Sequence, residues 1–241
     1  MIFDHGSLNN NKKVFKDMNN KNITPISRRG MITGALLSAG ALALLPTTLN
    51  ARAEGEEDYS KMRFFSDVPS TLEGAAAINF MASKAIMAGY PNGTFRPNAT
   101  TNRDTIMVFL YRLLNAPAFR PPKASPFVDV GTNNVFYKEI TWGYENGVTE
   151  GWTTSRGLEF RPLQPVKRDA MAAFLMRASE DKEPAAAKTF SDVDVTQPHA
   201  AAMTWMNTVL GVGTKGGTYR PLDNATRKEV AEFLFSYVHK F

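Results

Sequence analysis

The sequence predicts a mostly helical protein made of three consecutive copies of a helix–loop–helix unit. The tetrad Phe-x-Asp-Val occurs at residues 65–68, 127–130 and 190–193. An aromatic-Arg-Pro triplet follows each tetrad, at residues 95–97, 160–162 and 219–221. A further arginine comes seven residues after the arginine of each triplet. The same motifs in the same order three times indicate an internal repeat rather than chance.

The first element in chain order is an N-terminal segment with the layout of an export signal. An apolar run spans residues 31–45, which is shorter than the roughly 20 residues of a membrane-spanning helix. Basic residues precede the run, and Ala51 and Ala53 offer small side chains before a cleavage point, so residues 1–53 are predicted to be a signal peptide. Arg28 and Arg29 resemble a twin-arginine motif, and a general secretion signal with an incidental arginine pair is the alternative. Either route predicts an exported protein with no membrane span after cleavage.

The remaining chain divides into predicted repeats at residues 64–116, 126–180 and 189–241. Proline-rich or polar stretches separate them. In each repeat, apolar residues at positions +3, +6, +7 and +10 from the last arginine form one stripe of a second helix. These residues are Ile106, Phe109, Leu110 and Leu113, then Met171, Phe174, Leu175 and Ala178, then Val230, Phe233, Leu234 and Tyr237.

Each second helix is predicted to begin at an arginine, which is Arg103, Arg168 or Arg227. Thr226 and Glu229 have the spacing of a capping box. A cation in the first turn is disfavoured by the helix dipole, so three such arginines require an explanation. One is an anion held jointly by the guanidinium group and the free N–H groups of the helix start. The other is a surface arginine that covers apolar area or pairs with a carboxylate of a neighbouring repeat, and the sequence leaves both open.

Composition excludes several functional classes. Residues 1–53 carry seven basic and two acidic side chains, a difference equal to the formal net charge of +5 of the whole chain. The repeats are therefore formally neutral and lack the basic surface of a nucleic-acid-binding protein. The chain has no cysteine, and its three histidines are scattered along the sequence. We accordingly predict no nucleic-acid partner, no metal site and no cofactor.

These motifs resemble those of the S-layer homology family. Its typical pattern is a Phe-x-Asp-Val start, a helix, a Gly-Tyr-x-Asp-Gly-Thr-Phe-Arg-Pro loop and a Thr-Arg-Ala-Glu helix start. Residues 89–97 read Gly-Tyr-Pro-Asn-Gly-Thr-Phe-Arg-Pro, and residues 213–221 read Gly-Thr-Lys-Gly-Gly-Thr-Tyr-Arg-Pro. The second copy, at residues 162–171, is similar to a variant common in Gram-positive actinobacteria. The resemblance extends from residue 64 to residue 240.

The resemblance implies three units arranged with pseudo-threefold symmetry around a central helical bundle. One unit of roughly 50 residues buries too little apolar surface to fold alone. The resemblance also implies that grooves between the units bind secondary cell-wall polysaccharide, typically through a pyruvylated sugar. It assigns the anionic contact to Arg103, Arg168 and Arg227, stacking on sugar rings to Tyr90 and Trp152, and hydrogen-bond acceptance from sugar or loop backbone to Asp67, Asp129 and Asp192.

Departures from the family pattern predict that the three grooves are unequal. Thr214 stands where the loop aromatic residue is expected in the third copy, and the second loop is longer than the first. Only the third helix start, Thr-Arg-Lys-Glu, is close to the usual form. One or two functional grooves are therefore expected.

The favoured function is that of a non-catalytic protein of the cell wall or cell surface, because the three repeats leave little room for a catalytic domain. The first alternative is an adaptor or S-layer-like lattice protein that acts through a surface protein partner. The second is a wall hydrolase, which is less favoured because no Ser/His/Asp arrangement or metal-ligand cluster appears.

Overall fold

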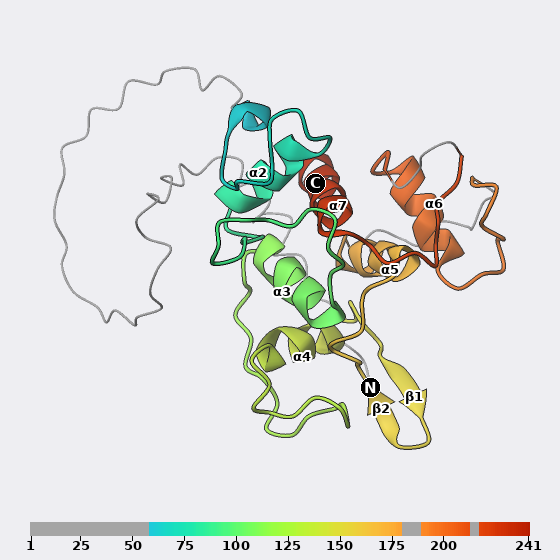
Figure 1. Cartoon of the computed structure of the whole chain (residues 1–241). Coiled ribbons are helices and arrows are strands. Elements are labelled where there is room, and N and C mark those ends of the chain that lie inside the picture. Colours follow the sequence, from blue (N-terminus) through green and yellow to red (C-terminus); the bar gives the residue numbers. More distant parts are fainter. Residues whose placement is uncertain (1–57, 180–188, 213–216) are drawn as a thin grey trace, which may run out of the picture.

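The computed structural model describes residues 58–179, 189–212 and 217–241 (Figure 1). The predicted signal peptide, with Arg28, Arg29, Ala51 and Ala53, lies outside the described residues, and so does Thr214. The described part contains a short 3-10 helix η1 (Tyr59–Lys61), six α-helices and one two-stranded hairpin. The prediction of a mostly helical protein is confirmed. Within the same residues, no helix combines the length and the apolar character needed to cross a membrane.

The α-helices alternate between two kinds of start. Helices α2 (Ala75–Ser83), α4 (Tyr137–Glu145) and α6 (Ala200–Thr208) follow the Phe-x-Asp-Val tetrads. Helices α3 (Arg103–Leu113), α5 (Arg168–Ser179) and α7 (Arg227–Lys240) follow the aromatic-Arg-Pro triplets and begin at the predicted arginines. All twelve residues of the predicted apolar stripes are buried. The capping box of Thr226 and Glu229 is also present.

The closely packed helix pairs join different predicted repeats. Helix α3 packs on α4, α5 packs on α6, and α7 packs on α2. Each pair therefore combines the second helix of one repeat with the first helix of the next, and the last repeat returns to the first. Figure 1 shows these pairs around the middle of the molecule, with α2, α4 and α6 farther out than α3, α5 and α7.

A closed ring of backbone hydrogen bonds joins the segments that precede α3, α5 and α7. The N–H group of Val166 donates to Thr101 O at 2.8 Å, Ala225 N–H donates to Val166 O at 2.9 Å, and Thr101 N–H donates to Ala225 O at 3.3 Å. Each of these buried residues lies two positions before a helix-start arginine. The ring fixes the three helix starts relative to one another.

The longer second loop forms a hairpin that the sequence analysis did not predict. Strand β1 (Trp152–Thr154) pairs antiparallel with β2 (Gly157–Glu159), and Trp152 is opposite Glu159. The Thr154 hydroxyl donates to Gly157 O at 2.9 Å, and the Arg156 backbone N–H donates to the same hydroxyl at 3.2 Å. The hairpin accommodates the extra residues of this loop and supports Trp152.

Candidate functional site

The three helix-start arginines are buried and reach across the chain to another loop. The Nε–H of Arg103 donates to Phe160 O at 2.9 Å. Arg168 donates in the same way to Tyr219 O, and Arg227 to Phe95 O, each at 2.8 Å. Their exposed fractions are only 4, 4 and 6%. Each arginine thus binds the aromatic residue of the triplet in the next repeat, so the arginines do not lie on the surface. The alternative of a carboxylate partner from a neighbouring repeat holds for Arg168, which pairs with Glu229 at 2.6 Å.

The expectation of free N–H groups at the helix starts is also wrong. In α3, the Arg103 N–H donates to Gln164 O at 3.0 Å, and the Asp104 N–H donates to Pro162 O at 3.1 Å. The first two N–H groups of α5 and of α7 bind loop carbonyls in the same way. These carbonyl oxygens offset the positive end of the helix dipole, which explains why a cation is tolerated at this position. An anion in the adjacent pocket would therefore meet the guanidinium group rather than the helix N–H groups.

The three predicted aspartates bind the backbone of the loops at the aromatic-Arg-Pro triplets. Asp67 accepts hydrogen bonds from the N–H groups of Phe95 and Arg96, at 2.7 and 2.8 Å. Asp129 binds residues 160–161 and Asp192 binds residues 219–220 through the same pair of contacts. The carboxylates therefore hold the loop backbone in place, and they do not line the pockets described below.

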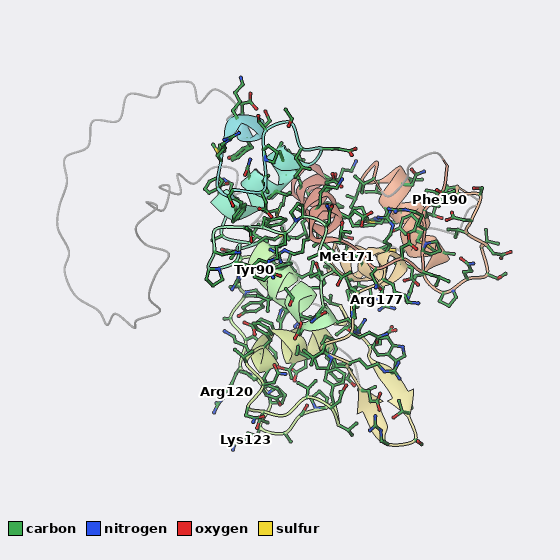
Figure 2. All side chains as sticks on the ribbon, in the orientation of Figure 1. Tyr90, Arg120, Lys123, Met171, Arg177 and Phe190 are labelled. Carbon is green, nitrogen blue, oxygen red and sulfur yellow. The ribbon has the colours of Figure 1, made fainter. Side chains whose placement is uncertain are left out.

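Both predicted aromatic residues lie within cation–π distance of two arginines. The guanidinium carbon of Arg96 is 3.9 Å from the ring centre of Tyr90, and that of Arg227 is 5.3 Å away. For Trp152 the corresponding distances are 4.1 Å to Arg103 and 4.6 Å to Arg161. Such cation–π contacts orient the ring and desolvate the cation on one side. Figure 2 shows Tyr90 beside α3.

The sequence analysis did not identify the arginines of the aromatic-Arg-Pro triplets as site residues. Arg96, Arg161 and Arg220 all have left-handed backbone conformations, with φ of 58°, 60° and 59°. This backbone turn follows the aspartate-bound N–H group and directs each side chain toward a pocket or its aromatic residue. The signal in the sequence was the threefold recurrence of the arginine itself, which the analysis used only to mark the repeat.

Three pockets each contain one helix-start arginine. The Arg227 pocket, about 310 Å³, includes Tyr90, Thr101, Asn102, Thr105, Arg112 and Phe136. The Arg103 pocket, about 310 Å³, includes Trp152, Arg161, Lys167, Asp169, Ala170 and His199. The Arg168 pocket, about 800 Å³, includes Arg220, Asp223, Thr226, Lys228, Glu229 and Glu232. The structure thus brings Tyr90 to Arg227 and Trp152 to Arg103, whereas no described aromatic residue of the third loop stacks in the Arg168 pocket.

Of the three pockets, the Arg227 pocket has the lining best suited to an anionic, hydroxyl-rich ligand. Its charged lining residues are Arg112 and Arg227, and it has no carboxylate. The Thr101 side chain is only 3% exposed, and its hydroxyl oxygen has no hydrogen-bond partner among the described residues. The Asn102 side chain forms no capping hydrogen bond, although Asn102 is the N-cap residue of α3. A buried unpaired hydroxyl is costly unless a ligand satisfies it.

The Arg103 pocket is also cationic, but it contains a titratable pair. Burial, together with the nearby charge of Arg161, lowers the pKa of Arg103 to about 9, so the guanidinium remains charged at neutral pH. Burial lowers the pKa of His199 and raises the pKa of Asp169. Burial thus favours the neutral form of both side chains of this pair.

The described residues contain no group of three or more His, Asp or Glu side chains that would hold a metal ion. The pockets are instead built from guanidinium groups, aromatic rings, hydroxyls and amides. Guanidinium groups can bind carboxylates through charge-assisted hydrogen bonds, and aromatic rings can stack on the apolar faces of sugars.

Comparison with known proteins supports the resemblance to the S-layer homology family. Residues 64–105 match the family model of the S-layer homology domain, a segment that includes Asp67, Tyr90 and Arg103. The chain is 28% identical to the S-layer protein EA1 of Bacillus anthracis over 70% of its own length and 19% of that protein. It is 29% identical to an endoglucanase of Bacillus sp. strain KSM-635 over 79% of the chain and 20% of the enzyme. For an amylopullulanase of Thermoanaerobacterium thermosulfurigenes the identity is 27%, over 84% of the chain and 11% of the enzyme.

The chain therefore spans about a fifth or less of the length of these relatives. The shared part is a small segment both of the two enzymes and of the S-layer protein, which is the pattern of an attachment module rather than of a catalytic domain. The domain match and the S-layer relatives support anchoring to the cell wall in general. They place the protein at the cell surface or cell wall.

Proposed function

We propose that the protein is a non-catalytic module that binds an anionic cell-wall polysaccharide in the pockets between successive repeats. The observation that carries this proposal is the recurrence of a buried guanidinium group in each of the three pockets. In each of them the arginine lies over an aromatic ring that also faces the pocket, namely Trp152 for Arg103, Tyr90 for Arg227 and Phe233 for Arg168. A pyruvylated sugar has both chemical groups that such a pocket fits, a carboxylate and an apolar ring face.

The architecture that we propose is three S-layer homology repeats, at residues 64–116, 126–180 and 189–241, with pseudo-threefold symmetry. The family model matches only the first of these segments. Support for the other two comes from the ring of backbone hydrogen bonds through Thr101, Val166 and Ala225 and from the cyclic order of the helix pairs. The predicted signal peptide would deliver this module to the wall.

In this proposal the site residues have different tasks. Arg103 and Arg227 contact the anionic group, and Trp152 and Tyr90 stack on sugar rings in the same pockets. Asp67, Asp129 and Asp192 act indirectly, because their carboxylates hold the loop backbone that carries the arginines of the triplets.

The experiment is co-sedimentation of the purified protein with cell walls, before and after chemical removal of their secondary polysaccharide. We expect binding to intact walls and its loss on stripped walls. Tyr90→Ala and Trp152→Ala should each weaken binding by about tenfold, because each truncates a partly buried aromatic anchor. Phe64→Ala is the control, since Phe64 is 40% exposed and lines none of the three pockets.

Equal sedimentation with intact and stripped walls would contradict the proposal, because the ligand would then be peptidoglycan or a wall protein. Unchanged binding by the double variant Tyr90→Ala, Trp152→Ala would reject the two pockets as the site. Arginine substitutions are unsuitable as the first test because each arginine also binds a loop carbonyl.

A further inference from the structure

The Arg227 pocket extends along one face of helix α3. The residues of α3 and its N-cap that line it are Asn102, Thr105, Val108, Phe109 and Arg112. Their spacing of three or four residues places them on the same side of the helix. From Asn102 to Arg112 the backbone rises by about 15 Å, which is more than the length of one pyranose ring. The pocket is therefore long enough for more than one sugar unit.

Arg227 and Tyr90 belong to the part of this pocket near the start of α3. The Arg227 N–H donates to Ala99 O at 2.8 Å, and the Thr101 N–H donates to Ala225 O at 3.3 Å. These bonds place the start of α7 beside the start of α3. The Tyr90 ring lies against the Arg227 guanidinium group, at 5.3 Å. In the proposed function, the acidic sugar occupies this part of the pocket.

Phe136 lines the same pocket from the other end of α3. The Lys138 ammonium nitrogen, in the first turn of α4, lies 5.1 Å from the ring centre of Tyr111, near the end of α3. Gly143, near the end of α4, lies against the side chain of Met107, closer to the start of α3. The two helices therefore run antiparallel, and Phe136, the N-cap residue of α4, lies beside the last turns of α3.

The Phe136 ring is available to a ligand. The ring is partly buried, and among the described residues no other aromatic ring and no cation stacks on it. The backbone is fixed, because the Phe136 N–H donates to Asn134 Oδ1 at 2.8 Å and the Ile140 N–H donates to Phe136 O at 2.9 Å. The N-cap residues of α2 and α6 are Gly74 and His199, which offer no such apolar ring.

Arg112, in the last turn of α3, supplies a second cation to this part of the pocket. Among the described residues, no carboxylate lies within ion-pair distance of it. Its Nη1 is 3.4 Å from Ile86 O, which is longer than an ordinary hydrogen bond. The equivalent arginine of α5, Arg177, instead pairs with Glu150 at 3.0 Å. Arg112 therefore retains donors for a ligand.

We propose that Phe136 and Arg112 form a second sugar subsite of the Arg227 pocket, next to the subsite of Arg227 and Tyr90. This inference deepens the proposed function and rests on it. When the acidic sugar lies against Tyr90, a neighbouring sugar of the same chain lies along α3. The Phe136 ring stacks on its apolar face, and Arg112 binds its hydroxyl or acidic groups. The pocket thus binds a segment of polysaccharide rather than a single sugar.

The test compares a single sugar with longer fragments of the polysaccharide in NMR titrations of the whole protein. The single sugar is the methyl mannoside that carries a pyruvate ketal, and the fragments are size-fractionated oligosaccharides cut from the polysaccharide stripped from cell walls. The backbone N–H signals of Tyr90 and Asn102 report binding in this pocket. We expect the oligosaccharides to shift these signals at concentrations at least about tenfold lower than the single sugar, because they occupy both subsites.

Two variants separate the subsites. Phe136→Ala should weaken oligosaccharide binding by about tenfold and single-sugar binding by less than about twofold. Arg112→Gln, at an exposed position, should weaken oligosaccharide binding by about fivefold and leave the single sugar unaffected. Retained binding of the single sugar shows that each variant is folded. Phe64→Ala and Arg120→Gln are the matched controls, since both residues are exposed and line none of the three pockets.

Equal affinity of the unaltered protein for the single sugar and the oligosaccharides would overturn the inference. So would an equal loss of both ligands in Phe136→Ala, which is what a purely structural role of the ring predicts. If the oligosaccharides bind but neither variant weakens them, the second subsite is rejected and the proposed function stands. If the oligosaccharides do not bind at all, the proposed function fails and the second subsite fails with it.

Discussion

At the residue scale, each helix-start arginine lines a pocket and also donates hydrogen bonds to other parts of the fold. The Nε–H group binds a loop carbonyl, while Nη1 of Arg168 binds Glu229 at 2.6 Å and Nη2 of Arg227 binds Ala88 O at 2.7 Å. Lysine has a compact ammonium group and cannot present donors in this forked geometry. Arginine is therefore required for the structure as well as for the charge.

We expect Arg227→Lys to lower the free energy of unfolding by about 2 kcal/mol, because hydrogen bonds to Phe95 O and Ala88 O are lost in a buried setting. Urea denaturation measures the change. Arg120→Lys is the matched control, since Arg120 is exposed and lies in the segment between the first and second predicted repeats. A loss no larger than that of the control would show that charge alone is sufficient at position 227.

The pH dependence of stability should contain a contribution from Glu229. Burial opposes its ionisation, but the Thr226 N–H and the charge of Arg168 hold the pKa of Glu229 below its ordinary value of 4.5. A lowered folded pKa means that this contribution is fully present above about pH 4.5 and is lost as the pH falls through the folded pKa. We expect Glu229→Gln to be less stable at neutral pH, by about 2 kcal/mol, and to lose less stability on acidification.

Chemical denaturation at a series of pH values between neutral and acid checks this expectation. Parallel stability curves for the unaltered protein and Glu229→Gln would contradict it, because the ionised carboxylate would then contribute nothing that the amide lacks. Asp192 also has a lowered pKa, since the N–H groups of Tyr219 and Arg220 outweigh its desolvation. This second group remains in both proteins and cancels in the comparison.

At the element scale, the loop before each pocket aromatic residue depends on a close backbone approach. Gly151 precedes Trp152, has φ of +71°, and lies where a Cβ would be 2.7 Å from Glu159 O and 2.9 Å from the Phe127 ring. Gly147, at the end of α4, has nearly the same φ of +69° but no atom within 4 Å of a Cβ. Alanine substitutions at these two glycines therefore measure separately the free-energy cost of the left-handed backbone and the added cost of crowding.

We expect Gly147→Ala to destabilise the protein by about 1–2 kcal/mol, the cost of a left-handed backbone for alanine. Gly151→Ala should cost about 3 kcal/mol or more, because crowding against a backbone oxygen adds to that strain. Displacement of β1 should also weaken glycan binding in the Arg103 pocket. Thermal unfolding and wall co-sedimentation measure the two effects, and equal destabilisation by both substitutions would show that the close approach carries no cost.

The sequence predicted where these helices lie along the chain better than it predicted which helices pack together. Apolar spacing and the recurring arginines located α3, α5 and α7, because helix starts and stripes are local properties. The pairing of α2 with α7 depends on residues more than a hundred positions apart, and no local pattern specifies it. The same reason explains the site: the capping role of Glu229 was predicted, and a carboxylate of a neighbouring repeat was one predicted partner of the arginines, but the sequence did not identify Glu229 as the partner of Arg168, 61 residues away.

At the scale of the whole molecule, the three predicted repeats stabilise one another in a closed cycle. Helix α7 completes a pair with α2, and Arg227 binds the loop at Phe95, so the last predicted repeat supports the first. The ring through Thr101, Val166 and Ala225 needs all three segments as well. The segment that matches the S-layer homology domain, residues 64–105, therefore lacks the helix against which its own α2 packs.

We expect that a fragment ending at residue 179 does not fold, because α2 and α5 both lose the helices on which they pack. The free-energy cost of exposing the apolar faces of these two helices would exceed the net stability of a typical domain, which is only about 5–15 kcal/mol. Circular dichroism and urea denaturation of the fragment test this expectation, with the full chain as the control. Addition of a peptide of residues 189–241 should restore helicity, Arg227 contacts and a single unfolding transition. A cooperative transition in the fragment alone would mean that the helix pair α3–α4 and its loops are sufficient, and that closure of the ring adds stability without being required for folding.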